Sequence, residues 1–147
     1  MLFKPEADNN PKIKKLMITD SPISNEQLSA AAFTRQSVAF DEIYAHNTIV
    51  RYKRERVRAH IRKYLPVNSN ILELNAGTGE DAIYFARESH TVHATDISDG
   101  MLNELVAKVK KNNLEGNITS EKCSFTELDS LENKGPFNLI FSKLCRP

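Results

Sequence analysis

The stretch that decides the fold is residues 70–82, NILELNAGTGEDA. Its first half is a short apolar run with partial alternation, which is typical of a strand, and residues 80–88 place apolar side chains at helical intervals. Between them, Gly77 and Gly79 allow a sharp turn and a close approach that a side chain would obstruct. A ligand can therefore lie against the backbone of this turn and face the free amides and positive dipole end of the next helix.

Strands and helices alternate outward from this turn. The other predicted elements are helices near residues 25–35, 47–64 and 98–112 and strands at residues 91–95, 117–122 and 137–142. Such alternation favours right-handed crossovers and a parallel sheet covered by helices on both faces. We therefore predict an α/β fold in which residues 1–66 form a mobile and helical N-terminal cap segment and residues 67–147 form the sheet domain.

The composition is that of one soluble globular unit. The chain has 147 residues, a formal charge of +1, 27% charged residues and 40% hydrophobic residues. These values argue against disorder and against a protein that binds polyanions over its whole surface. Two cysteines, no signal-peptide pattern and no apolar run near the ~20 residues of a membrane-spanning helix predict a cytoplasmic protein without a membrane contact.

Two clusters of polar residues have less specific interpretations. Residues 51–63 contain seven basic side chains against Glu55 alone. We interpret this run as a solvated helix face, with contact to nucleic-acid phosphates as the less favoured alternative. His90 and His93 are three residues apart on a predicted strand, so they point to opposite faces, and we predict no metal site there.

Acidic residues around the glycine turn indicate what kind of ligand it takes. Asp96 ends the second predicted strand, where its two oxygens can accept both hydroxyls of a ribose. The turn alone also fits a dinucleotide. However, Glu73 in the first strand and the pair Glu80 and Asp81 at the helix start would repel a pyrophosphate, whereas an ammonium and a sulfonium would be attracted. The pattern favours S-adenosylmethionine over NAD, and an NAD-dependent oxidoreductase fragment is the first alternative.

The segment ILELNAGTGEDAIYFA, followed by VHATDIS and Met101-Leu102, resembles the class I S-adenosylmethionine-dependent methyltransferases, which have a Rossmann-like fold. The resemblance covers residues 71–142. It implies a methionine-binding end at the turn, a ribose contact from the acid after the second strand, and adenine contacts from the residues that follow and from the turn after the third strand. The residues that this assigns to the cofactor are Glu73, Asn75, Ala76, Gly77, Thr78, Gly79, Asp81, Asp96, Ile97, Met101, Ser124 and Phe125.

The N-terminal segment supplies two more candidates. In the resembled family, the segment before the first strand often closes over the cofactor. Tyr44 is then placed to cover the methionine moiety and Arg51 to hold its carboxylate. The alternative is that Tyr44 belongs to the apolar stripe of a packing helix. Asp81 likewise either contacts the cofactor's amino group or favours the helix start electrostatically.

The chain departs from the family pattern in three ways. Asn75 stands where a glycine is frequent, and Ser124 stands where an aspartate is common. The family's sheet has seven strands, whereas this sequence ends just after the predicted fourth. We therefore expect a truncated form of a longer enzyme, with a homodimer through the exposed edge of the fourth strand as one way to cover that edge.

The expected activity is methyl transfer to a small-molecule acceptor. Alignment of the acceptor with the methyl sulfonium would supply most of the catalysis. The sequence identifies no catalytic base, and Cys123 is predicted to be structural because no histidine is placed to activate it. A non-catalytic module that binds S-adenosylmethionine or another nucleotide is the second alternative.

Overall fold

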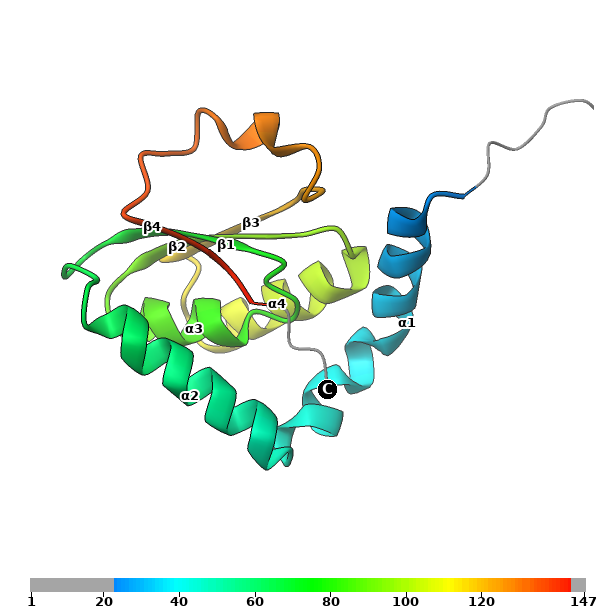
Figure 1. The fold of residues 1–147 in the computed structure, drawn as a ribbon, viewed down its shortest axis with the longest axis horizontal. Coiled ribbons are helices and arrows are strands. Elements are labelled where there is room, and N and C mark those ends of the chain that lie inside the picture. Colours follow the sequence, from blue (N-terminus) through cyan, green and yellow to red (C-terminus); the bar gives the residue numbers. More distant parts are fainter. Residues whose placement is uncertain (1–22, 144–147) are drawn as a thin grey trace, which may run out of the picture.

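The computed structural model describes residues 23–143. The first residues, which the sequence predicted to be mobile, and Cys145 lie outside this range. Figure 1 shows two helices preceding a sheet whose strands alternate with helices. The elements are α1 (Asn25–Ala45), α2 (Thr48–Arg62), β1 (Asn70–Leu74), α3 (Glu80–Arg87), β2 (Thr91–Asp96), α4 (Asp99–Lys111), β3 (Ile118–Lys122), the 3-10 helix η1 (Leu128–Leu131) and β4 (Leu139–Ser142).

All four strands of the described sheet are parallel and lie in the order β3-β2-β1-β4. Strand β1 is central, and its last residue, Leu74, pairs with Thr95 of β2 and with Ser142 of β4. The carboxyl ends of β1, β2 and β4 therefore meet at one edge of the sheet. The predicted α/β class with a Rossmann-like parallel sheet is confirmed.

The two faces of the sheet are covered differently. Figure 1 shows α2, α3 and α4 on one face and the η1 segment on the other. Beneath the helices lies a core that includes Ile71, Phe85 and Leu105, each fully buried. A smaller cluster beneath η1 contains Leu72, Leu74, Cys123 and Leu131. Because side chains alternate along β1, Glu73 shares the helix-covered face with Ile71.

Helix α1 is longer than its sequence pattern predicted. It begins with a capping box, in which the Ser24 side chain accepts from Gln27 N and the Gln27 side chain accepts from Ser24 N, and it continues past residue 35 to Ala45. Of its residues, Ser37 is the single buried one. A Cβ on Gly100 of α4 would lie 2.8 Å from the Cα of Thr34, so the two helices touch almost backbone to backbone. This contact sets α1 over the carboxyl edge of the sheet.

No helix within residues 23–143 combines the length and the apolarity that crossing a membrane requires.

Candidate functional site

The turn after β1 needs residues that tolerate positive φ. Asn75, Gly77 and Gly79 have φ values of 55°, 58° and 79°. Asparagine is one of the few residues with a side chain that adopt this conformation readily, which explains why Asn75 stands at a position often held by glycine. Its Nδ2 also donates to Ser142 Oγ at 3.1 Å, which joins the ends of β1 and β4.

The two glycines are needed for different reasons. A Cβ on Gly79 would lie 2.6 Å from Cγ of Leu105, so Gly79 allows α4 to pack against the turn. By contrast, apart from its two neighbours in the chain, no described residue comes within 4 Å of the position that a Cβ on Gly77 would take. That space belongs to a cavity, so the backbone at Gly77 is open to a ligand.

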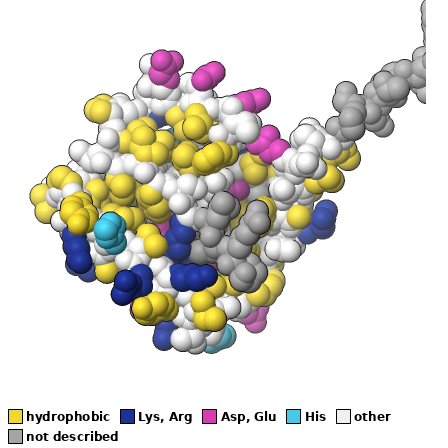
Figure 2. Space-filling view, viewed as in Figure 1, with side chains coloured by type: hydrophobic (Ala, Val, Ile, Leu, Met, Phe, Trp, Pro, Cys, Tyr) yellow, Lys and Arg dark blue, Asp and Glu magenta, His cyan; other side chains and the backbone are white. Residues whose placement is uncertain are grey.

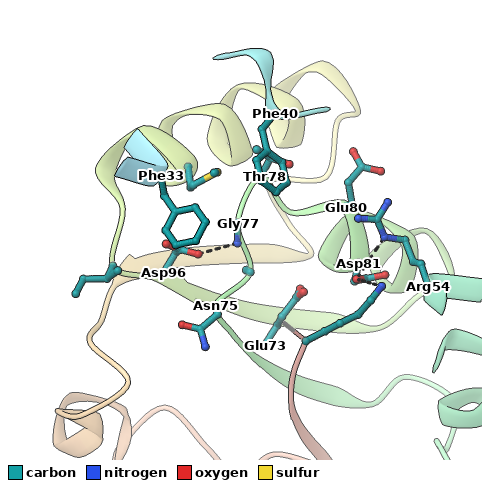
Figure 3. A pocket seen from close by; sticks show the side chains of 14 residues that line it. Phe33, Phe40, Arg54, Glu73, Asn75, Gly77, Thr78, Glu80, Asp81 and Asp96 are labelled. Atoms are coloured by element: carbon teal, nitrogen blue, oxygen red, sulfur yellow. Dashed lines mark hydrogen bonds and ion pairs between the residues drawn. The ribbon is translucent and has the colours of Figure 1, made fainter. Parts of the chain in front are cut away.

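This cavity has a volume of about 120 Å³ and lies at the carboxyl edge of the sheet. Figure 3 shows α1 contributing Phe33 and Phe40 from one side and α2 contributing Arg54 from another. The lining residues are Phe33, Phe40, Arg54, Glu73, Asn75, Ala76, Gly77, Thr78, Glu80, Asp81, Asp96, Ile97, Met101 and Lys143.

At one end of the cavity, the carboxylate of Asp96 accepts hydrogen bonds from backbone amides. Its Oδ2 accepts from Gly77 N at 2.8 Å and its Oδ1 accepts from Ser98 N at 2.9 Å. A carboxylate has about four lone-pair sites, so two remain for a ligand. Ile97, the next residue along the chain, lines the same cavity, as do Phe33 and Met101. This end therefore offers a hydrogen-bond acceptor flanked by apolar side chains.

At the other end, Glu73 is buried with an unsatisfied oxygen. Its side chain lines the cavity, the residue is 3% exposed, and its Oε2 has no hydrogen-bond partner among residues 23–143. Burial raises the pKa of the Glu73 carboxyl well above its usual range, and the charge of Asp81 raises this pKa further. Basic neighbours oppose this shift only in part. A buried acid with a free oxygen is costly unless a partner binds it.

Asp81, in the first turn of α3, collects those basic neighbours. Arg58 Nε donates to Asp81 Oδ1 at 2.6 Å, and Lys143 Nζ donates to Oδ2 at 3.3 Å. Arg54 Nε lies 3.7 Å from the same Oδ2, yet it makes no hydrogen bond with any described residue. Arg54 and Lys143 therefore border the cavity as cations that share one carboxylate.

These contacts correct the interpretation of the basic run for two of its members. Arg54 and Arg58 turn inward and tie α2 to α3, and Arg58 also donates to the carbonyl of Glu80 at 2.8 Å. Other basic residues of the run, including Lys53 and Arg56, are exposed, as predicted for a solvated face. Figure 2 shows dark-blue Lys and Arg side chains along the side of the molecule where α2 lies.

The structure brings most of the sequence-predicted site residues to this one cavity. Gly79 lies just outside the lining because it packs against Leu105. The predicted residues that line the cavity are Glu73, Asn75, Ala76, Gly77, Thr78, Asp81, Asp96, Ile97 and Met101.

Besides Gly79, four predicted residues lie outside the cavity lining. Tyr44 packs on Phe40, with ring centroids 4.6 Å apart, as in the alternative of a packing helix. Arg51 is exposed and pairs with Glu55 at 3.8 Å. The Ser124 hydroxyl is engaged with the Glu26 carboxylate of α1, and the ring of Phe125 is exposed.

Five lining residues were not among the predicted site residues: Phe33, Phe40, Arg54, Glu80 and Lys143. Of these, Glu80 had been noted only as part of the acidic pair at the helix start. Phe33 and Phe40 are seven residues apart, which is two helical turns, so the pattern places them on one face of α1. Arg54 and Arg58 are four residues apart, so the same reasoning places them on one face of α2. No signal in the sequence indicates Lys143, since its role depends on β4 ending beside β1.

No group of three or more potential His, Cys, Asp or Glu ligands is arranged around a metal position in the part of the chain that the structure describes. The cavity instead offers Asp96, whose oxygens accept backbone hydrogen bonds, with apolar residues in the same lining. It also offers Glu73, one of whose oxygens has no hydrogen-bond partner among the described residues, together with the cations Arg54 and Lys143. These groups suit a ligand with a sugar and a flat ring at one end and a zwitterion at the other.

Comparison with known proteins identifies the family. Residues 71–146 match the family described as Methyltransferase domain, and the chain belongs to that family. No curated protein matches the sequence significantly.

Solved structures with the same fold include three methyltransferases. A Methanococcus maripaludis protein assigned as S-adenosyl-L-methionine-dependent has a TM-score of 0.53 at 18% identity, covering 62% of this chain and 42% of that chain. A Galdieria sulphuraria protein assigned as a sarcosine dimethylglycine methyltransferase has a TM-score of 0.51 at 22% identity, covering 59% and 32%. Coclaurine N-methyltransferase, solved with N-methylheliamine and SAH, has a TM-score of 0.51 at 15% identity, covering 60% and 26%. The matched part of this chain thus spans less than half the length of each.

Proposed function

We propose that this methyltransferase domain binds S-adenosylmethionine in the cavity and transfers its methyl group to a small-molecule acceptor. The observation that carries the proposal is the free Oε2 of Glu73, buried beside cations at one end of a cavity whose other end is Asp96. The family match and the shared fold support the same cofactor class.

The charges at the Glu73 end suit the methionine part of the cofactor. Glu73 would accept from the ammonium group, which satisfies its free oxygen. Arg54 and Lys143 would hold the carboxylate, a role for which the sequence had suggested Arg51. Three cations, namely Arg54, Arg58 and Lys143, face two acids, Glu73 and Asp81, in this cluster. The surplus positive charge therefore matches an added carboxylate.

The Asp96 end suits the adenosine part. Asp96 would accept from the ribose hydroxyls with its remaining lone pairs, and Gly77 would let the ligand approach the backbone. Ile97, Met101 and Phe33 line the cavity and would pack against adenine. Ser124 and Phe125 would meet the adenine edge only if the loop after β3 shifted.

The bound cofactor would supply an electrophilic methyl group, and the chain's own residues would bind and orient it. Phe33 and Phe40 of α1 would keep water from one side of the cavity. The charges at this end do not by themselves separate S-adenosylmethionine from NAD, because Arg54, Arg58 and Lys143 surround Asp81 and Lys108 pairs with Glu80. The family match is what favours S-adenosylmethionine over NAD.

Calorimetric titration of the whole chain with S-adenosylhomocysteine and with NAD tests this proposal. We expect saturable binding of S-adenosylhomocysteine at one site and no binding of NAD at the same concentrations. Binding of NAD alone would reject the proposal in favour of a dinucleotide enzyme. Binding of S-adenosylhomocysteine without transfer to any acceptor would keep the site and leave a binding module.

A further inference from the structure

Helix α1 lines one side of the cavity, and no extensive apolar interface holds its C-terminal half there. Its C-terminal half carries Phe40 into the lining, yet Val38 and Ile43 in the same half are 83% and 60% exposed. Little apolar area is therefore buried to keep this half of the helix in place. Polar contacts must supply most of what holds it down.

Those polar contacts converge on Lys108, near the C-terminal end of α4. Its Nζ lies 2.7 Å from Asp41 Oδ2 of α1 and 2.5 Å from Glu80 Oε1 of α3. It also donates to Thr78 Oγ1 at 3.2 Å, and the Thr78 hydroxyl donates to Asp41 Oδ1 at 2.5 Å. One ammonium thus joins α1, the glycine turn, α3 and α4.

The contacts along α1 differ between its middle and its C-terminal half. In the middle, Thr34 Oγ1 and Ser98 Oγ lie 2.8 Å apart and Gly100 packs against the helix backbone. Within residues 38–45, Asp41 is the one residue through which the described hydrogen bonds and ion pairs reach the sheet domain. The middle of α1 therefore has both polar and backbone contacts with α4, whereas Asp41 provides the polar contacts between the C-terminal half of α1 and the sheet domain.

The cavity is small for the ligand that the proposed function assigns to it. Its volume of about 120 Å³ is below the range of ~300–1,000 Å³ that is typical of ligand pockets. Phe40 lines the cavity from α1, as Figure 3 shows. A ligand with both adenosine and methionine parts needs more room than this cavity has, and an outward shift of this half of α1 would supply it.

We propose that Lys108 is a latch, a positioning residue whose shared contact with Asp41, Glu80 and Thr78 holds the C-terminal half of α1 closed and whose release gates exchange of the ligand. The latch itself does not depend on which ligand binds, and only its role in exchange rests on the proposed function. The side chains of Asp41 and Glu80 are 40% and 43% exposed, so salt weakens the latch.

Spin labels can report the position of α1 without any ligand. Ile43→Cys and Val67→Cys, at two exposed positions, would carry the labels in a Cys145→Ser background, and Cys123 is buried. We expect one narrow distance distribution by double electron–electron resonance. Lys108→Met should raise the share of a second, open distance about fivefold or more, and 1 M NaCl should raise it in the latched chain.

A matched control removes a similar ion pair elsewhere. Lys122 Nζ lies 2.7 Å from Asp99 Oδ2, and neither residue contacts α1 through a described hydrogen bond or ion pair. Lys122→Met should leave the distance distribution unchanged. Asp41→Asn, which keeps Lys108 but weakens its contact to α1, should open the helix as Lys108→Met does, and it serves if Lys108→Met folds poorly.

The latch is rejected if Lys108→Met and Asp41→Asn keep the closed distribution, or if far-UV circular dichroism shows that they unfold α1 instead of displacing it. Stopped-flow release of S-adenosylhomocysteine gives the functional readout, and we expect release to be at least fivefold faster in Lys108→Met. If the chain with its natural Lys108 does not bind S-adenosylhomocysteine, the proposed function fails while the spin-label distances still judge the latch.

Discussion

Asp96 and Glu73 are acids on neighbouring parallel strands, and both line the same cavity. They differ in whether the protein itself supplies hydrogen-bond partners for their oxygens. Asp96 accepts two backbone hydrogen bonds, from Gly77 and Ser98. Glu73 is buried with an oxygen that has no hydrogen-bond partner among the described residues, and its pKa is raised by burial. Asp96 therefore serves the folded turn even without a ligand, whereas Glu73 costs stability until a cation binds it. Substitutions should separate these two kinds of acid.

The largest effect is expected at Asp96. Asp96→Ala leaves two backbone amides without charge-assisted acceptors, so we expect the free energy of unfolding to fall by about 2–3 kcal/mol. Affinity for S-adenosylhomocysteine should fall by about 1–3 kcal/mol as well. Urea unfolding and calorimetry measure the two effects. Asp129→Ala, at an exposed acid on η1, is the control. An Asp96→Ala variant as stable as the natural chain would contradict the role of Asp96 in holding the turn.

Glu73 should behave in the opposite way. Because its folded-state pKa lies above the unfolded value of about 4.3, the folded state retains the proton longer, and stability falls as pH rises from the unfolded pKa towards the folded pKa. Glu73→Gln removes this loss, so we expect its free energy of unfolding to exceed that of the natural chain by about 1–2 kcal/mol at pH 8.

The same Glu73→Gln variant should bind S-adenosylhomocysteine more weakly, because the amide oxygen can accept a hydrogen bond from the ammonium group but carries no opposite charge. Stability gained together with affinity lost is the expected signature, measured by urea unfolding at pH 4 and pH 8 and by calorimetry. A variant that is less stable at pH 8 would show that Glu73 is satisfied in the folded protein.

A smaller effect is expected within α2, where the structure favours one arginine over another. Arg54→Met should weaken binding of S-adenosylhomocysteine about tenfold, or ~1.4 kcal/mol, because it removes a proposed carboxylate contact. Arg51→Met, one turn earlier and paired only with Glu55, should leave the dissociation constant unchanged. The reverse result would restore the role that the sequence suggested for Arg51.

The smallest effect concerns the turn that joins the two acids. Asn75→Ala and Asn75→Gly both remove the hydrogen bond to Ser142, so their difference isolates the cost of positive φ at this position. We expect the alanine variant to be about 1 kcal/mol less stable than the glycine variant in thermal or urea unfolding. Equal stabilities would mean that the turn relaxes to another conformation.

The sequence predicted those parts of the molecule that depend on local patterns. Alternation and helical spacing indicated every strand of the described sheet, and the two glycines located the turn. The acids at the ends of β1 and β2 could be paired because the carboxyl ends of parallel strands meet at one edge. These inferences need only the periods of strands and helices and the handedness of the crossovers.

The rest depended on how distant elements dock. Arg54 reaches the cavity, whereas Arg51 does not, because α2 approaches α3 through the contacts of Arg54 and Arg58 with Asp81. The spacing of Phe33 and Phe40 indicated a shared face of α1, but not that this face covers the turn. Lys143 joins the site through the pairing of β4 with β1, which no local pattern of residues near it reveals.

The measurement closest to the central claim is a titration of the 15N-labelled chain with S-adenosylhomocysteine, followed by amide chemical shifts. The account predicts saturating shifts at Gly77, Gly79 and Ile97 and at Glu73, while the opposite face of the sheet around Leu131 stays unchanged. Saturation with shifts confined to residues outside the cavity, or no saturation at all, would contradict it.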